Sequence, residues 1–133
     1  MMSQFGVQIH TKSNTKGTGN GKKVIKSRDK RRAEIGSYFS ATKMSGDNVL
    51  RAHRMRGGLV KKVLKGAGFA NLLTEGGYKK TKITGVLESK DNRNFARQNI
   101  ITKGTIINTE AGKAEVINRP GREGSINARL IKV

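Results

Sequence analysis

The chain lacks several residue types and patterns on which large classes of protein depend. Its 133 residues include no cysteine, which excludes a disulfide framework, a thiolate metal site and a cysteine nucleophile. The sequence holds no run of about 18 apolar residues, so it predicts no membrane span. The first residues (MMSQF) show no charged segment followed by an apolar stretch, and we therefore expect no secretory signal. These absences indicate a soluble protein of the cytoplasm or nucleus.

Acidic residues and histidines are also scarce, with nine Asp and Glu and two His in the chain. His10 and His53 lie 43 residues apart and the acids are scattered singly, so neither a metal-ligand cluster nor paired carboxylates for acid–base catalysis are evident. The spacing from Gly17 to Lys22 fails the phosphate-binding-loop pattern. Phe69 has no second aromatic residue beside it, so an RNA-stacking signature of the RRM type is missing. The sequence therefore predicts no enzyme, no metal, no cofactor and no small-molecule substrate.

Positive charge dominates what is present. Lys and Arg number 28, and the formal net charge is +19. Because such charges repel one another in the free protein, the imbalance indicates a polyanionic partner. Residues 1–32 hold nine basic residues and one acid, a net charge of +8. Residues 11–23 contain no apolar side chain, so we expect an extended or disordered segment there; a flexible solvated tail is the alternative.

Two basic groups follow each other in the first half of the chain. The cluster KSRDKRR occupies residues 26–32, and a second group lies at 51–56. Short basic runs are often solvated faces or localisation signals, but two in succession favour nucleic-acid binding. The mixed apolar and basic stretch 59–73 is compatible with a strand pair or a short helix, and Gly66 and Gly68 argue against a long helix.

The last 55 residues have the pattern of a small β-sheet protein. Residues 82–89 (KITGVLES) are rich in β-branched and apolar residues and predict a strand. Residues 90–92 predict a turn, and 92–98 predict one or two helical turns that present Arg93 and Arg97 on one face. The remaining strands and turns are expected at 99–107, 110–112, 113–118, 119–124 and 125–133.

Short strands joined by turns that contain glycine predict a mainly β fold, as a small β-barrel or curled sheet. Gly104 and Gly112 are expected at turn or bulge positions. In the last strand apolar and polar residues alternate, which is typical of a strand with one buried face. The residues assigned to the barrel core are Ile100, Ile106, Val116, Ile126, Ala128 and Leu130.

Several motifs, in a consistent order along the chain, resemble one ribosomal protein family. The densest are FARQNIITKGTII at 95–107, TEAGKA at 109–114 and NRPGREG at 118–124, followed by Asn127-Ala128. The earlier ones are KRRAEIG at 30–36, Arg56-Gly57-Gly58 with Lys61 and Lys62 after it, and Ala70-Asn71. The family that they resemble is the archaeal and eukaryotic-type protein eight of the small ribosomal subunit, the S-eight-e family. The chain lacks the long insertion of eukaryotic members and looks like the compact archaeal form.

The resemblance implies a structural constituent of the small ribosomal subunit, which binds ribosomal RNA beside other ribosomal proteins in the cytoplasm. It implies a long extended basic N-terminal tail, residues 1–36, that runs along RNA, and a small β-barrel domain, residues 37–133. Lys and Arg would neutralise phosphates and release counterions. The candidate RNA-binding residues are Lys12, Lys16, Lys22, Lys23, Lys26, Arg28, Lys30, Arg31, Arg32, Arg51, Arg54, Arg56, Lys61, Lys62, Arg93, Arg97, Lys103 and Arg119.

Two other functions stay open at this point. A free-standing nucleic-acid-binding module, in chromatin or on messenger RNA, would use the same basic residues outside the ribosome. A small RNA-cleaving enzyme would need a carboxylate cluster, for which Glu88, Asp91 and Glu110 are the candidates.

Overall fold

The computed structural model describes residues 15–25, 28, 31, 36 and 38–131, and the chain divides into two units, Met1–Phe39 and Ser40–Val133. In the first unit, residues 15–23 turn back on themselves. Thr15 pairs with Lys23 in an antiparallel bridge, and the Lys16 N–H donates to the Lys22 carbonyl at 2.9 Å. This closed loop is a local departure from the extended path that the composition of the tail predicts.

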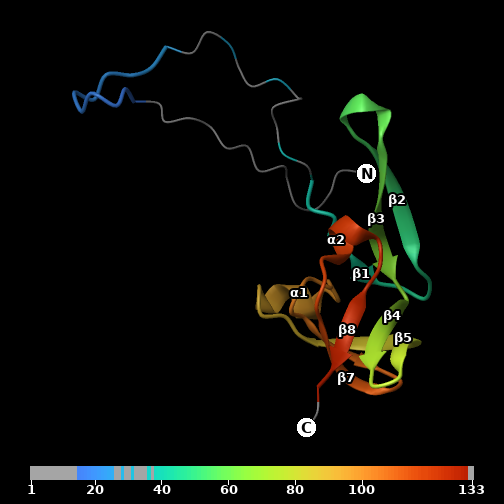
Figure 1. Ribbon diagram of the computed structural model, residues 1–133. Helices are drawn as coiled ribbons and strands as arrows, with labels where there is room; N and C mark the ends of the chain where they lie inside the picture. The colour runs from blue at the N-terminus through green and yellow to red at the C-terminus, as the bar shows by residue number, and fades with distance from the viewer. Residues whose placement is uncertain (1–14, 26–27, 29–30, 32–35, 37, 132–133) are drawn as a thin grey trace. The chain divides into compact units, whose positions relative to one another are not determined.

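The second unit is mainly β, as the sequence predicts, and most of its strands form a small barrel (Figure 1). The elements are β1 Lys43–Met44, β2 Val49–Arg54, a 3₁₀ turn Arg56–Gly58, β3 Val60–Ala67, β4 Phe69–Thr74, β5 Gly77–Glu88, α1 Arg93–Arg97, β6 Ile106–Thr109, β7 Gly112–Val116, α2 Pro120–Glu123 and β8 Asn127–Leu130. Strands β4-β5-β6-β7-β8 make a closed barrel, and β1-β3-β2 make a separate three-stranded sheet. The barrel closes because β4 pairs with β8 in parallel.

Alternate residues of the barrel strands point inward and form one apolar core. In β4 the buried residues are Ala70 and Leu72, and in β7 they are Ala114 and Val116. The core prediction is confirmed for Val116, Ile126 and Ala128, which are buried in this cluster, and for Leu130, which packs against it partly buried. Ile100 is also buried but lies outside the cluster, where Ile101 takes its place.

The strand expected at 99–107 begins only at Ile106, and this part of the prediction is wrong. Asn99 (φ 54°) and Gly104 (φ 79°) take left-handed conformations that turn the chain before the strand starts. The buried isoleucine of β6 is Ile107, whereas Ile106, which the sequence assigned to the core, is only half-buried. Because neighbouring strand residues face opposite sides, a register error of one residue exchanges core and surface.

The other predicted elements overlap observed ones, with different bounds. The strands expected at 113–118 and 125–133 are β7, Gly112–Val116, and β8, Asn127–Leu130, and residues 132–133 lie outside the described residues. Residues 82–89 belong to β5 except for the last of them, and the helical turn at 92–98 is α1. The turn expected at 119–124 contains a short helix that the sequence analysis missed, although Pro120 at its first position and Gly124 after its end are helix signals. Gly112 follows the β6–β7 turn with a φ of 123°, as a turn glycine should.

The stretch 59–73 forms two consecutive strands, β3 and β4, rather than a helix. The two strands do not pair with each other, because β3 belongs to the three-stranded sheet and β4 to the barrel. Gly68 separates the two strands, and its N–H donates to the Asn48 Oδ1 at 2.9 Å. A Cβ at position 68 would overlap the backbone of Gly46. Glycine is therefore required where the chain passes from β3 into the barrel.

Candidate nucleic-acid interface

Strands β2 and β3 form an antiparallel hairpin that extends beyond the barrel, with its connecting turn at the far end (Figure 1). The Met55 N–H donates to the Leu59 carbonyl at 2.7 Å and closes this turn. Leu64 anchors the base of the hairpin in the core, whereas all six residues of β2 are exposed. A two-stranded hairpin is marginally stable in water on its own. The hairpin is therefore an exposed arm that is held at its base by Leu64 and by the pairing of β1 with β3.

Both faces of this hairpin are basic. Alternate residues of a strand face opposite sides, and the register puts Arg51 and Lys61 on one face and Arg54 and Lys62 on the other. Arg56 lies in the turn between the strands. The sequence holds no acidic residue from position 48 to position 74. The fold thus gathers onto one arm five predicted RNA-binding residues that are spread over twelve positions of the sequence.

The tip of the hairpin adds apolar surface to this charge. Met55, Leu59 and Val60 are 45%, 68% and 55% exposed. The minor groove of A-form RNA is wide and shallow and is contacted through its sugars and phosphates. A narrow ribbon with cations on both faces and apolar side chains at its end can reach phosphates on two sides while its tip packs on sugars or bases.

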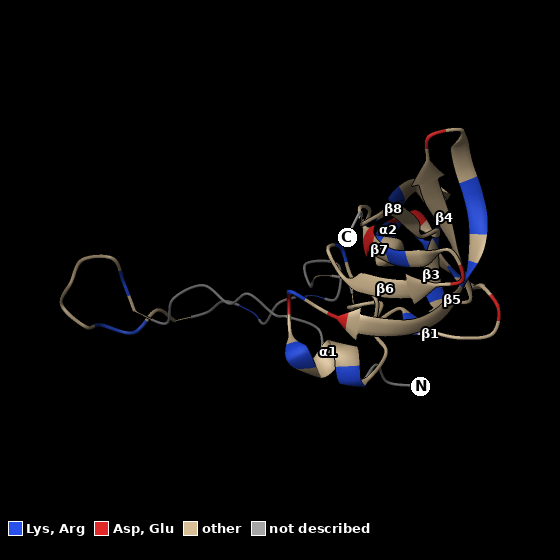
Figure 2. Cartoon of the chain, turned by 90° about the horizontal axis from the view of Figure 1, so that it is seen from below, with Lys and Arg blue, Asp and Glu red and all other residues tan. Residues whose placement is uncertain are grey.

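Three other predicted arginines lie on or next to the two short helices of the second unit. Arg93 and Arg97 are exposed and four residues apart on α1, where Lys and Arg are drawn in blue (Figure 2). The helix begins at Asn92, whose side chain accepts a hydrogen bond from the Asn94 N–H at 2.9 Å. Arg119 is exposed and immediately precedes α2.

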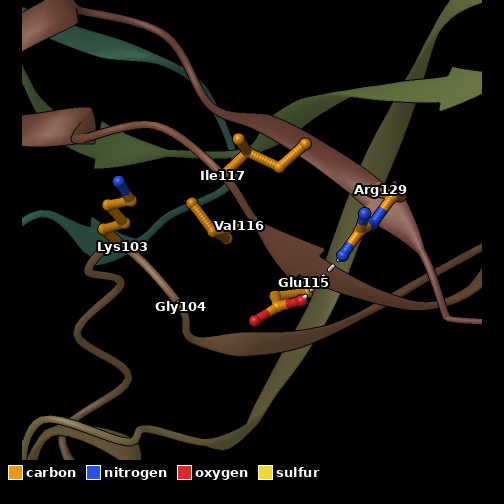
Figure 3. Close-up of a pocket in the computed structure, with 6 residues that line it drawn as sticks. All are labelled: Lys103, Gly104, Glu115, Val116, Ile117 and Arg129. Atoms are coloured by element: carbon orange, nitrogen blue, oxygen red, sulfur yellow. Dashed lines mark ion pairs between the residues drawn. The ribbon is translucent and has the colours of Figure 1, made fainter.

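Lys103 is the remaining predicted RNA-binding residue of the second unit. It lines a hollow of about 240 Å³ in the barrel wall. Val116 and Ile117 are its apolar part, and Arg129 points at the Glu115 carboxylate from the side opposite Lys103 (Figure 3). The Arg129 Nη2 lies 3.5 Å from Glu115 Oε2. Because this carboxylate is already engaged by cations of the chain, it does not supply a free base or metal ligand.

Glu115 is held by two cations. The Lys90 Nζ donates to Glu115 Oε1 at 2.9 Å and is the main cause of a lowered pKa of Glu115, which falls below its ordinary value of 4.5. Arg129 lowers this pKa further, while partial burial of the carboxyl works in the opposite direction. Lys90 precedes α1 and Glu115 lies in β7. The ion pair therefore fastens the segment that carries Arg93 and Arg97 to the barrel.

The lowered pKa predicts how this fastening depends on pH. The stabilisation is complete above the unfolded pKa of about 4.5 and is lost as the pH falls through the lower folded pKa. Glu115→Gln should reduce the thermal unfolding midpoint at pH 7 by a few degrees at most, because both cations are largely exposed. The difference between this variant and the natural protein should shrink as the pH falls below 4.5 and vanish below the lower pKa of Glu115 in the folded state. Glu110→Gln, the same change in an exposed turn, is the control, and a difference that persists at low pH would contradict the ion-pair explanation.

In the first unit, the described part of the tail exposes several predicted residues. Lys16, Lys22 and Lys23 lie on the closed loop 15–23, and Arg28 and Arg31 are also exposed. Four predicted residues lie outside the described part of the chain, namely Lys12, Lys26, Lys30 and Arg32.

Two features are missing from the part of the chain that the structure describes, a metal-binding cluster and a membrane-spanning helix. Within 15–25, 28, 31, 36 and 38–131, no three or more His, Asp or Glu side chains come together as a metal site would require. Among the helices of this same part of the chain, none is long and apolar enough to cross a membrane.

The sequence analysis missed one group of cations, Lys79, Lys80 and Lys82 in β5. All three are exposed. Their signal is the stretch YKKTK at 78–82, of which only Lys82 belongs to a predicted strand.

Comparison with known proteins gives a consistent result. The family model of ribosomal protein S8e matches residues 10–131. The small ribosomal subunit protein eS8 of Sulfurisphaera tokodaii is 47% identical over 114 residues, which cover 84% of this chain and 89% of that protein. The proteins of the same name from Hyperthermus butylicus and Methanococcus maripaludis (strain C5) are 43% and 38% identical, each over 84% of this chain and over 84% and 88% of their own lengths.

Proposed function

Because the chain belongs to the ribosomal protein S8e family, we propose that it binds the RNA of the small ribosomal subunit through the β2–β3 hairpin and the basic N-terminal tail. The hairpin carries the proposal, because it is exposed, cationic on both faces and free of acidic residues. We also propose that the chain contacts neighbouring ribosomal proteins and supports assembly of the small subunit.

Family membership confirms the coarser expectations from the sequence. The resemblance was correct, and the chain is a structural ribosomal protein of archaeal type rather than an enzyme. A ribosomal protein works in the cytoplasm. The RNA contacts of individual residues and the tail boundary at residue 36 remain proposals.

The proposed mechanism follows from the two-faced hairpin. Arg51 and Lys61 would bind phosphates on one side, while Arg54 and Lys62 would bind phosphates on the other, so the hairpin would sit between two RNA segments. Arginine suits such contacts because its planar guanidinium binds two phosphate oxygens at once. Each neutralised phosphate releases condensed counterions, which makes the affinity depend strongly on salt. Arg93, Arg97, Lys103 and Arg119 would add contacts from the barrel side.

Removal of the tail tests the proposal in assembled subunits. A chain that lacks residues 1–32 loses a net charge of +8 and should sediment with small subunits at least about tenfold less than the full chain at moderate salt, because several phosphate contacts are lost. Its barrel should stay folded, since Ser40–Val133 is a compact unit of its own. Sucrose-gradient sedimentation measures incorporation, and circular dichroism checks the fold.

A second variant separates charge from length in the same experiment. It keeps residues 1–32 but carries Gln at the nine Lys and Arg positions of this segment, and it should fail to incorporate as the deletion does. Normal incorporation of both variants would contradict the role of the tail. A full-length chain that stays mainly at the top of the gradient would instead support a free-standing nucleic-acid-binding module.

A further inference from the structure

The outer face of the β4–β5 hairpin presents an aromatic and an aliphatic side chain side by side. Leu73 of β4 and Tyr78 of β5 are direct cross-strand partners. Leu72 points into the core, so Leu73 points outward. Tyr78 is 70% exposed and Leu73 is 40% exposed. This apolar pair is larger than the isolated exposed residues that any protein surface carries.

Cations flank the pair along the strand. Lys80 and Lys82 follow Tyr78 at alternate positions of β5 and therefore share its outer face. The Lys80 Nζ lies 4.6 Å from the centre of the Phe69 ring. Phe69 and Tyr78 are the two aromatic residues that strand pairing places on this face, and of these two it is Phe69 that has a cation over its ring. Lys and Arg colour much of β5 close to the β4–β5 turn blue (Figure 2).

An open groove begins beside this pair at the end of the barrel. Its volume is about 970 Å³, and it is lined by Leu73, Leu130 and Ile131 together with the charged residues Lys113 and Arg129. Arg129 is the pairing partner of Leu73 on β8. Glu75, in the β4–β5 turn, is the acidic residue of the groove. The apolar lining is therefore bordered mainly by positive charge.

We propose that this face, Tyr78 and Leu73 with Lys80 and Lys82, binds an unpaired nucleotide of RNA. The base would stack on the Tyr78 ring and contact Leu73 at the entrance of the groove, while the two lysines bind the adjoining phosphates. Exposed aromatic rings beside cations are the arrangement by which β-sheet surfaces bind single-stranded nucleic acid. The cations favour this polyanion over a second protein as the occupant. The proposal deepens the function proposed above and adds a site that is separate from the β2–β3 hairpin.

The composition of the chain allows stacking to be measured directly. Tyr38 and Tyr78 are the two tyrosines, and the chain has no tryptophan. In a Tyr38→Phe background, tyrosine emission therefore reports Tyr78 alone. Titration with a single-stranded hexa-adenylate RNA should quench this emission, because a base stacked in van der Waals contact with the excited ring quenches it. Tyr78→Thr, which keeps a strand-forming residue but removes the ring, should weaken hexa-adenylate binding about 10-fold, the size expected for one stacked base.

The controls separate this site from the hairpin. Tyr78→Phe keeps the ring and should bind hexa-adenylate as the natural chain does. A 16-base-pair RNA duplex should bind Tyr78→Thr with unchanged affinity, because it offers no unpaired base. Equal affinity of Tyr78→Thr and the natural chain for hexa-adenylate, with no quenching at saturation, would overturn the proposal and favour a protein partner on this face. If a variant without the hairpin arginines still binds the RNA duplex as the natural chain does, the function proposed above is contradicted. The result for hexa-adenylate and Tyr78 would still stand.

Discussion

Replacing Arg51, Arg54 and Arg56 together with glutamine should weaken binding to an RNA duplex by roughly 100- to 1,000-fold at about 0.1 M salt. Each phosphate contact contributes about 0.9 to the slope of log affinity against log salt. At about 0.1 M salt, one decade below 1 M, the loss of one contact therefore lowers the affinity nearly tenfold. The three residues lie on two faces and the turn of one hairpin, so all of them can contact one bound RNA. The slope itself should fall by about 3.

A matched variant shows whether the place or only the number of charges matters. Replacing Lys43, Lys79 and Arg122 with glutamine removes the same charge from exposed positions outside the hairpin. We expect this variant to lose far less affinity for duplex RNA, because none of the three lies in β2, β3 or the turn between them. Electrophoretic mobility shifts at several salt concentrations measure both variants. Equal losses would mean that the net charge of +19, rather than the hairpin, determines binding.

Leu64→Ala should cost about 2–5 kcal/mol of folding free energy, which is the range for a buried leucine truncated in a packed core. Leu64 has no exposed surface and belongs to the barrel core, although it is part of the hairpin strand β3. Its carbonyl also accepts a hydrogen bond from the Thr42 Oγ1 at 2.7 Å. Because small domains are stable by only about 5–15 kcal/mol, the loss removes a large share of the total. Urea unfolding followed by circular dichroism measures it.

Leu50→Ala is the control within the same strand pair. Leu50 is the cross-strand partner of Leu64 but is 49% exposed, so the same truncation should cost about 1 kcal/mol or less. Similar losses for the two variants would show that the base of the hairpin is not anchored through Leu64. The Leu64 variant should also bind RNA more weakly at temperatures where it is still folded, since the hairpin then pivots on a loosened base.

The barrel could largely be predicted from the sequence because its strands are short, apolar on alternate positions and separated by turn residues. Ile126 and Ala128 follow this pattern and are buried. The pattern failed at Ile106, where the strand starts late because Asn99 and Gly104 take left-handed conformations. A lone Asn and a lone Gly give only a weak indication of such a turn.

The β2–β3 hairpin could not be predicted, because β2 has no buried face. Its sequence VLRAHR shows no core-facing alternation, and every residue in it is exposed. The pairing of β2 with β3 is seen only in the three-dimensional structure. The basic residues at 51–56 and at 61–62 can be picked out from the sequence, since charge is visible there, whereas the arm that they share is visible only in the fold. Tyr78 escaped notice because its partner Leu73 becomes a neighbour only through pairing.

The parallel pairing of β4 with β8 has a consequence for the order in which the chain folds during its own synthesis. Asn71 and Asn127, whose side chains are hydrogen-bonded at 3.1 Å, are 56 residues apart. The barrel therefore cannot close until Asn127 has emerged from the translating ribosome, and closure of so long a segment is slow. Residues 1–32 emerge before any strand of the barrel. A nascent chain therefore exposes a segment with a net charge of +8 before its barrel can form.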